Sequence, residues 1–175
     1  MNEAIRNLLE RRSVRSYTAQ PVSHEDLETI VKVGYHSPSG VNRQTWHFTV
    51  ISNREKLDRL AAVMRESLGL AENYCFYQAP VLIIVSNLKP ETSLPGADSA
   101  CALTNMFNAA HALGLGSVWI NQVNDGCKHP AVRALLTEYG VPADHVVYGS
   151  AAIGHPAADL PARAQKNPNV VTWVD

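Results

Sequence analysis

Hydrophobic residues follow two different spacings along the chain, and the two spacings alternate. Apolar residues three or four positions apart predict helices at residues 2–11, 23–34, 54–68, 95–114 and 130–140. Short alternating or continuous apolar runs predict strands at residues 47–52, 80–87, 116–121 and 145–154. Helices and strands therefore interleave, while the pattern does not reveal the order of the strands in a sheet.

The C-terminal end departs from this alternation. Residues 156–168 contain many Ala and Pro residues and few helix signals, and NVVTWV at 169–174 then has the pattern of a last strand. A strand separated from its sheet by an irregular arm can add to the sheet of another chain as easily as to its own.

Composition narrows the class of protein. The 175 residues suit a single domain over residues 1–175. With 46% hydrophobic and 18% charged residues the chain is slightly more apolar than a lone monomer needs, which favours a buried subunit interface. The net charge of -1 gives no basis for nucleic acid or an anionic membrane as a partner. Three widely spaced cysteines and an N-terminus without an apolar leader predict a cytoplasmic protein. The longest apolar run, PVLIIV, has the length of a strand rather than of a membrane helix.

A basic segment, RRSVRSY at 11–17, places Arg11, Arg12 and Arg15 around Ser13. Guanidinium groups are permanently charged and donate hydrogen bonds in pairs, so this cluster suits a phosphate monoester or a planar, electron-rich heterocycle. A solvated basic helix end, stabilised by the helix dipole, would explain the same residues. The segment alone leaves both interpretations open.

The loop HSPSGVNRQTWHF at 36–48 is unusually rich in residues that shape the backbone or carry amides. Pro38 and Gly40 fix the backbone shape. Ser39, Asn42 and Gln44 offer hydrogen-bond donors and acceptors, which suits the edge of a flat ring with alternating carbonyl and N–H groups. The alternative is a loop whose Ser and Asn side chains cap its own turns.

Other chemistries have less support. Cys127, His129 and His111 lack the spacing of a metal site. No GxSxG elbow is present, and GLGSV at 114–118 precedes a strand, the wrong order for a dinucleotide fingerprint. Asp98, near the start of the Ala-rich helix, is interpreted as a partner of the helix dipole rather than as a catalyst.

Taken in order, these segments resemble the nitroreductase family of flavoproteins. RRSVRSY resembles the family's R-x-S-x-R/K element, and SPSGVNRQTWHF resembles its P-S-x-x-N-x-Q-P-W segment. LGLGSVWINQ, AAIGHP and the arm before NVVTWV follow in family order, so the resemblance extends over about residues 4–174. It implies an α+β nitroreductase-like fold, with a central, mostly antiparallel sheet flanked by helices, in a homodimer whose subunits exchange the C-terminal strand.

The resemblance also implies FMN at the subunit interface, held by residues of both chains. One subunit would supply the basic segment, with Arg11 and Arg163 near the phosphate and Arg15 near the pyrimidine side of the flavin. The other would supply the loop. The cofactor-binding residues implied are Arg11, Arg12, Ser13, Arg15, Pro38, Ser39, Gly40, Asn42, Gln44, Asn121, Gln122, Gly154 and Arg163. Among these, Gln44 would support the loop, and Asn121 and Gln122 match the place where the family aims backbone N–H groups at flavin N5 and O4.

The implied activity is electron transfer from NADH or NADPH through FMN to a nitroaromatic, a quinone or an activated alkene, with ping-pong kinetics. No metal and no catalytic side chain beyond the flavin is implied, and Arg15 acts as an electrostatic stabiliser of the reduced flavin. The alternatives are a flavin-binding protein without turnover, a relative that uses reduced flavin for another reaction such as reductive dehalogenation, and a structural or interaction protein.

Two positions depart from the family pattern. Thr45 stands where the family usually has Pro before Trp46, which predicts a looser exit from the loop. In the C-terminal arm, Lys166 is a candidate for a second cation at the phosphate. The chain is also short for the family, so helical insertions that cover the acceptor site in larger members are expected to be missing.

Overall fold

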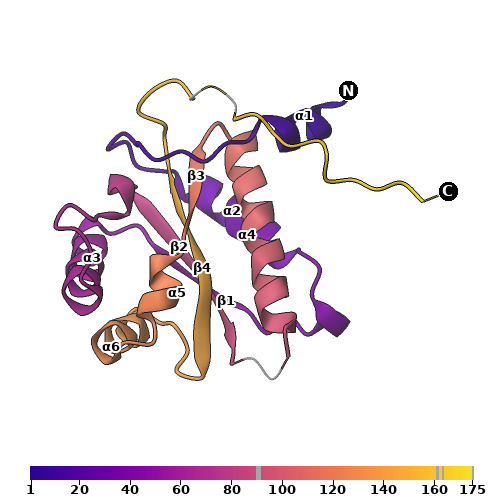
Figure 1. Cartoon of the computed structure of the whole chain (residues 1–175). Helices are drawn as coiled ribbons and strands as arrows, with labels where there is room; N and C mark the ends of the chain where they lie inside the picture. Colours follow the sequence, from indigo (N-terminus) through magenta and orange to yellow (C-terminus); the bar gives the residue numbers. More distant parts are fainter. Residues whose placement is uncertain (90–91, 161, 163, 175) are drawn as a thin grey trace.

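A four-stranded antiparallel sheet forms the centre of the molecule (Figure 1). The computed structural model describes residues 1–89, 92–160, 162 and 164–174. In spatial order the strands are β1 (His47–Ile51), β2 (Val81–Leu88), β4 (His145–Gly154) and β3 (Gly116–Ile120), and each pairs with its neighbours in antiparallel register. The predicted central antiparallel sheet is confirmed.

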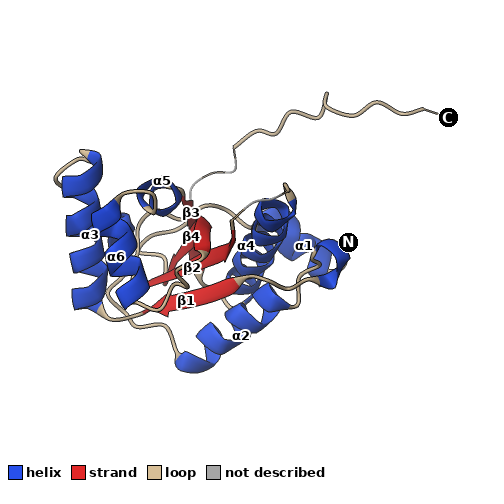
Figure 2. Ribbon diagram, turned by 90° about the horizontal axis from the view of Figure 1, so that it is seen from below, coloured by secondary structure: helices blue, strands red, loops and turns tan. Residues whose placement is uncertain are grey.

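Helices cover both faces of the sheet (Figure 2). On one face lie α2 (His24–Tyr35) and α4 (Leu94–Ala112), and on the other lie α3 (Arg54–Leu68), α5 (Gln122–Gly126) and α6 (Pro130–Glu138). The first helix, α1 (Glu3–Glu10), lies beside α4 at the end where α4 finishes (Figure 1). This arrangement gives two hydrophobic cores, one on each face of the sheet.

Strand β2 shows why the sheet needs helices on both faces. Leu82 and Ile84 point into the core under α3 and α6, whereas Ile83 and Val85 point into the core under α2 and α4. Successive side chains of a strand face opposite sides, so a continuous apolar run must be covered twice. The strand predicted from PVLIIVSN is confirmed.

Local signals place the helix ends. Ser23 accepts a hydrogen bond from the backbone N–H of Asp26, and Asn53 accepts one from that of Lys56, so each side chain caps an otherwise unpaired amide. Gly69 closes α3 in a left-handed conformation, which costs glycine little. The predicted start of α2 and both predicted ends of α3 are therefore confirmed.

Two predictions need correction. The short helix α5 was not predicted, because five residues that include Gly126 give no readable helical period. Residues 169–174 form no strand within the chain, since no neighbouring strand pairs with them, and their apolar side chains are exposed. The exchange of this segment with a second chain stays a prediction.

Gly116, the first residue of β3, allows the basic segment to pack directly on the sheet. A Cβ atom at this position would lie 2.7 Å from Cβ of Val14. We expect Gly116→Ala to lower the free energy of unfolding by about 1–3 kcal/mol, the usual cost of overpacking, measured by urea denaturation. Gly96→Ala is the control, because its Cβ would meet only a Tyr148 ring edge at 3.3 Å and Ala favours a helix. Equal unfolding free energies for Gly116→Ala and the unsubstituted protein would contradict the packing argument.

Candidate functional site

The basic segment 11–17 follows α1 in extended form and lies against the ends of β3 and β4. The backbone N–H of Val14 donates to the carbonyl of Ser117 at 2.9 Å, and the hydroxyl of Tyr17 donates to the carbonyls of Val14 at 2.6 Å and Ala152 at 3.2 Å. Burial raises the pKa of Tyr17, against a smaller lowering by Arg15, so its hydroxyl stays protonated and donates. Val14 and Tyr17 are buried, and Arg15 between them is exposed.

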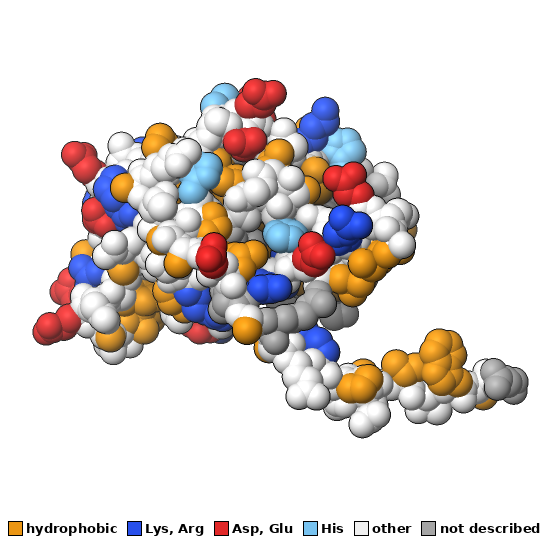
Figure 3. Space-filling model, turned by 90° about the horizontal axis from the view of Figure 1, so that it is seen from above, with side chains coloured by type: hydrophobic (Ala, Val, Ile, Leu, Met, Phe, Trp, Pro, Cys, Tyr) orange, Lys and Arg blue, Asp and Glu red, His pale blue; other side chains and the backbone are white. Residues whose placement is uncertain are grey.

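A cavity of about 760 Å³ lies over this segment. That volume is within the usual range for a small-molecule site. The residues that line it are Leu8, Leu9, Arg11, Arg12, Ser13, Arg15, Ala162, Ala164, Gln165 and Lys166. No Asp or Glu side chain is among these described lining residues, so the cavity concentrates positive charge. Figure 3 shows Lys and Arg side chains where the C-terminal arm leaves the body of the molecule.

The structure therefore brings together the four residues predicted from the basic segment and adds Lys166 from the arm. Arg163, the other arm cation of the prediction, lies outside the described residues. Guanidinium and ammonium groups around one cavity suit a phosphate, because each supplies charge-assisted hydrogen bonds. This donor set fits the phosphate end of FMN.

The loop 36–48 is bound to a different part of the molecule. Asn105 of α4 donates to Oγ of Ser37 at 2.8 Å, and the backbone N–H of Gly40 donates to Oδ1 of Asp98 at 2.9 Å. Oγ of Ser39 accepts from the backbone N–H of Gln44 at 3.2 Å. These contacts fix the start and the middle of the loop on α4.

Within the loop, polar side chains also bind one another. Nε2 of Gln44 donates to Oδ1 of Asn42 at 2.8 Å, which agrees with the predicted supporting role of Gln44. The interpretation of a loop that caps its own turns is thus correct for part of the loop. Pro38 and Asn42 nevertheless remain exposed, and Ser39 and Gly40 are half-buried, so their edges are available to a ligand.

Thr45, predicted to loosen the exit of the loop, is itself hydrogen-bonded. Its hydroxyl donates to Oδ1 of the fully buried Asn87 at 2.7 Å. Nδ2 of Asn87 in turn donates to the carbonyl of Pro95 at 3.3 Å, in the first turn of α4. A proline at position 45 could not make this contact, so the hydroxyl of Thr45 ties the exit of the loop in another way.

The middle of the loop and the basic cavity lie near opposite ends of α4, whereas the start of the loop reaches Asn105, two residues from Phe107. Asp98, which holds the loop, is in the second turn of α4, whereas the ring of Phe107 lies near its end, 5.8 Å from the Arg11 guanidinium. At 1.5 Å per residue these two positions are about 14 Å apart along the helix axis. One chain therefore does not gather all the predicted residues around a single cavity.

The remaining predicted residues lie elsewhere at the sheet. Asn121 immediately precedes α5, and its amide donates to Oδ2 of Asp125 at 3.1 Å. Gln122 begins α5 and lines a cavity of about 240 Å³ with Cys75 and Tyr77, among others. Gly154 ends β4 and is buried; its lack of a side chain has a packing reason, because a Cβ would lie 2.5 Å from the Pro80 ring.

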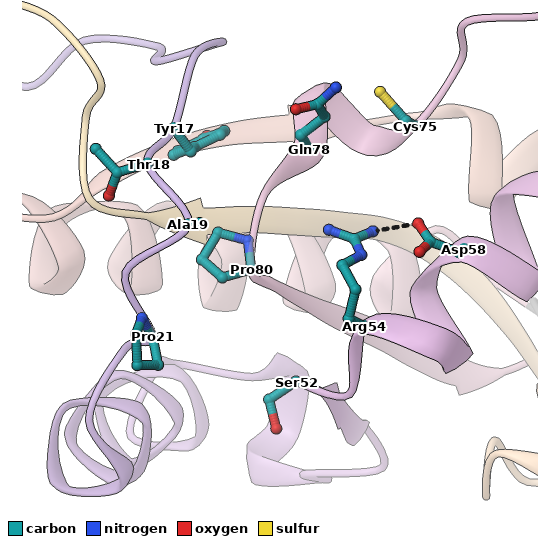
Figure 4. A pocket seen from close by; sticks show the side chains of 10 residues that line it. All are labelled: Tyr17, Thr18, Ala19, Pro21, Ser52, Arg54, Asp58, Cys75, Gln78 and Pro80. Atoms are coloured by element: carbon teal, nitrogen blue, oxygen red, sulfur yellow. Dashed lines mark ion pairs between the residues drawn. The ribbon is translucent and has the colours of Figure 1, made fainter.

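A further cavity of about 570 Å³ adjoins the Tyr17 side of the sheet (Figure 4). In Figure 4 Arg54 points at Asp58, with which it forms an ion pair at 2.9 Å, and it also donates to the carbonyl of Ala79. Its charge is balanced within the chain, so this cavity is a weaker candidate for an anion than the basic cavity.

Metal and membrane sites find no support in the described part of the chain. No group of three or more His, Cys, Asp or Glu side chains there could hold a metal ion. Cys127 is buried with its thiol against the carbonyl of Asn124, and His129 is exposed. Burial lowers the pKa of His111, with smaller contributions from Glu10, which raises it, and from neighbouring arginines, which lower it further. None of the helices described combines the length and the hydropathy needed to cross a bilayer.

Comparison with known proteins decides the family. The sequence profile described as the Nitroreductase family matches residues 8–155. The chain belongs to the nitroreductase family. A crystal structure of a nitroreductase with bound FMN from Bacteroides fragilis superposes with a TM-score of 0.96 at 39% identity, over 100% of both chains.

Two curated relatives show the same likeness in sequence. A protein of Archaeoglobus fulgidus, provisionally named NADH dehydrogenase/NAD(P)H nitroreductase, is 32% identical over 158 residues, which are 89% of this chain and 87% of that protein. The FMN reductase [NAD(P)H] of Bacillus subtilis is 29% identical over 174 residues, 90% of this chain and 67% of that protein. The α+β nitroreductase fold expected from the sequence motifs is confirmed.

The sequence did not reveal which residues outside the loop at 36–48 hold it in place. Asn87, Asp98 and Asn105 all hold it through hydrogen bonds. The one available signal was an amide or a carboxylate within an otherwise apolar strand or helix, as at Asn87 directly after PVLIIVS. Such a buried polar group requires a partner, although the sequence does not say which one.

Proposed function

We propose that this protein is an FMN-dependent oxidoreductase that takes electrons from NADH or NADPH and passes them to an electron-poor small molecule. Nitroaromatics, quinones and activated alkenes are the acceptor classes, and the two half-reactions alternate at one site in a ping-pong sequence. The observation that carries the proposal is the cavity of four cations, Arg11, Arg12, Arg15 and Lys166, together with membership of a family whose relatives bind or reduce FMN.

The active unit we propose is a homodimer with FMN between the two chains. Exposed apolar surface supports this. Ile5, Leu8 and Leu9 on α1 are about half exposed, and Trp173 of the arm is 85% exposed. A second copy of the chain would remove these side chains from water.

In this arrangement each part of the protein has a defined task. Arg11, Arg12 and Lys166 bind the phosphate, and Ser39 and Asn42 of the partner loop hydrogen-bond to the edge of the ring. Bound FMN supplies the electron-carrying chemistry, which needs no acid or base from the protein. Arg15 places a permanent positive charge where negative charge accumulates on reduction. The backbone of residues 121–122 donates toward the reacting edge of the ring.

A titration of the purified, FMN-free protein tests the proposal. We expect added FMN to bind, with a shift of its visible absorption band, and the band to bleach without oxygen when NADH or NADPH is added. Bleaching must then reverse on addition of a quinone. Binding without bleaching would identify a flavin-binding protein without turnover, and no binding at all would refute the proposal.

A further inference from the structure

We propose that Asp98 is a positioning residue that sets the backbone geometry of the flavin loop through the N–H of Gly40. The inference rests on the proposed function, since it concerns how one half of that site is built. It assigns to α4 a task that neither the sequence motifs nor the relatives' names indicate.

The loop conformation is one that the loop alone does not favour. Val41, Asn42 and Gln44 have φ angles of 54°, 55° and 49°, in the left-handed region. For residues other than glycine and asparagine, here Val41 and Gln44, this region costs on the order of 1–2 kcal/mol each, and strained backbone persists only when its surroundings hold it. Val41 is 86% exposed, so apolar burial does not supply that hold.

Hydrogen bonds within the loop, from the N–H groups of Asn42 and Gln44 to Ser39, supply part of that hold, and a buried carboxylate of α4 supplies the rest. Asp98 is only 6% exposed, and Oδ1 accepts from the Gly40 N–H at 2.9 Å. The carboxylate forms no ion pair with any described residue, so this backbone amide is its partner. Gly40 also packs closely on α4, where a Cβ would lie 2.9 Å from the Leu94 side chain. The contact immediately precedes the three left-handed residues and fixes where they begin.

Two outer contacts support the central one. Asn105 holds the entry of the loop through Ser37, and Asn87 holds the exit through Thr45 while also bonding the carbonyl of Pro95. All three anchors belong to α4 or bond to its first turn. The loop is thus fixed at two points on α4 and at a third on Asn87 of β2, with Asp98 at the central point.

Preorganisation gives this contact an effect on cofactor binding. A loop already in its binding conformation loses little conformational entropy when a ligand arrives, whereas a released loop must be ordered by the ligand. Removing Asp98 should therefore weaken FMN binding although Asp98 touches no ligand. Asp98→Asn keeps a carbonyl oxygen in place for the Gly40 N–H and should restore binding, because position rather than charge matters.

The test measures FMN affinity in a matched set of full-length variants. We expect Asp98→Ala to raise the FMN dissociation constant about tenfold, Thr45→Val to raise it less, and Asp98→Asn to stay within about threefold of the unsubstituted protein. Cys101→Ala is the control, because it shortens an exposed side chain of α4 within one turn of Asp98 that makes no hydrogen bond to the described part of the loop. Unchanged affinity in Asp98→Ala, or an equal loss in Asp98→Asn, would overturn the proposal.

Amide hydrogen exchange tests the same contact without any flavin. In the unsubstituted protein the Gly40 amide should exchange slowly although its neighbours Val41 and Asn42 are exposed, and exchange over residues 39–45 should accelerate in Asp98→Ala but not in Cys101→Ala. If FMN fails to bind, the proposed function fails while this measurement still decides the role of Asp98. If Asp98→Ala does not fold, a rapidly exchanging Gly40 amide in the unsubstituted protein refutes the anchor, and a protected one supports it.

Discussion

Replacing Arg15 with Ala is expected to slow flavin reduction by NADH or NADPH about ten- to a hundredfold and to leave the fold intact. The Arg15 side chain is exposed, and hydrogen bonds of Val14 and Tyr17 hold the basic segment on either side of it. The Ala substitution therefore removes the positive charge but no buried packing contact. A fixed charge aimed at developing negative charge commonly contributes effects of this size or larger. Stopped-flow absorbance without oxygen measures the reduction rate, and thermal unfolding checks the fold.

Two further variants make the Arg15 experiment specific. Arg15→Lys keeps the charge but loses the planar fork, so an intermediate rate is expected. Arg6→Ala removes the same charge from the exposed surface of α1 and should reduce normally. If Arg15→Ala binds FMN and is reduced at the rate of the Arg6→Ala control, Arg15 has no electrostatic role in the reaction.

Much of the fold could be predicted because its signals are local. Asn53 and Gly69 mark the two ends of α3 by capping chemistry, and the fully apolar run of β2 requires a sheet covered on both faces. The strand with which residues 169–174 would pair could not be predicted from such local signals. A strand pattern states that a segment can pair, whereas the partner strand is a property of the assembled fold.

The residues of the candidate site differ in the same way: some are close in sequence and predictable, and others meet only in the folded chain. The basic segment is continuous in sequence, so the amino-acid sequence alone is enough to group its arginines. The anchors of the loop act across 42 residues for Thr45 and Asn87, 58 for Gly40 and Asp98, and 68 for Ser37 and Asn105. Contacts at such separations depend on how α4 packs against the sheet, and helical periodicity does not report that. For this reason the sequence pattern at Thr45 does not reveal the bond to Asn87.

Deleting residues 169–175 is expected to have the largest effect on the proposed homodimer, namely its dissociation and with it loss of tight FMN binding. Val170, Val171, Trp173 and Val174 are all more than half exposed in the single chain. Burying an apolar side chain of this kind contributes about 1.5–3 kcal/mol, and a dimer would bury two such arms. We therefore expect the dimer dissociation constant to rise at least about a thousandfold, measured by sedimentation over a concentration series.

The deletion separates assembly from phosphate binding when it is compared with Lys166→Ala. Lys166 lines the basic cavity of its own chain, so its removal should weaken FMN binding and leave the dimer unchanged. Residues 169–174 lie in no strand and their side chains are exposed, so the deletion should leave the circular dichroism of the subunit nearly unchanged. A deleted protein that remains a dimer would show that other surfaces, such as the apolar side of α1, hold the subunits together. A deleted monomer that still binds FMN tightly would place the whole flavin site within one chain.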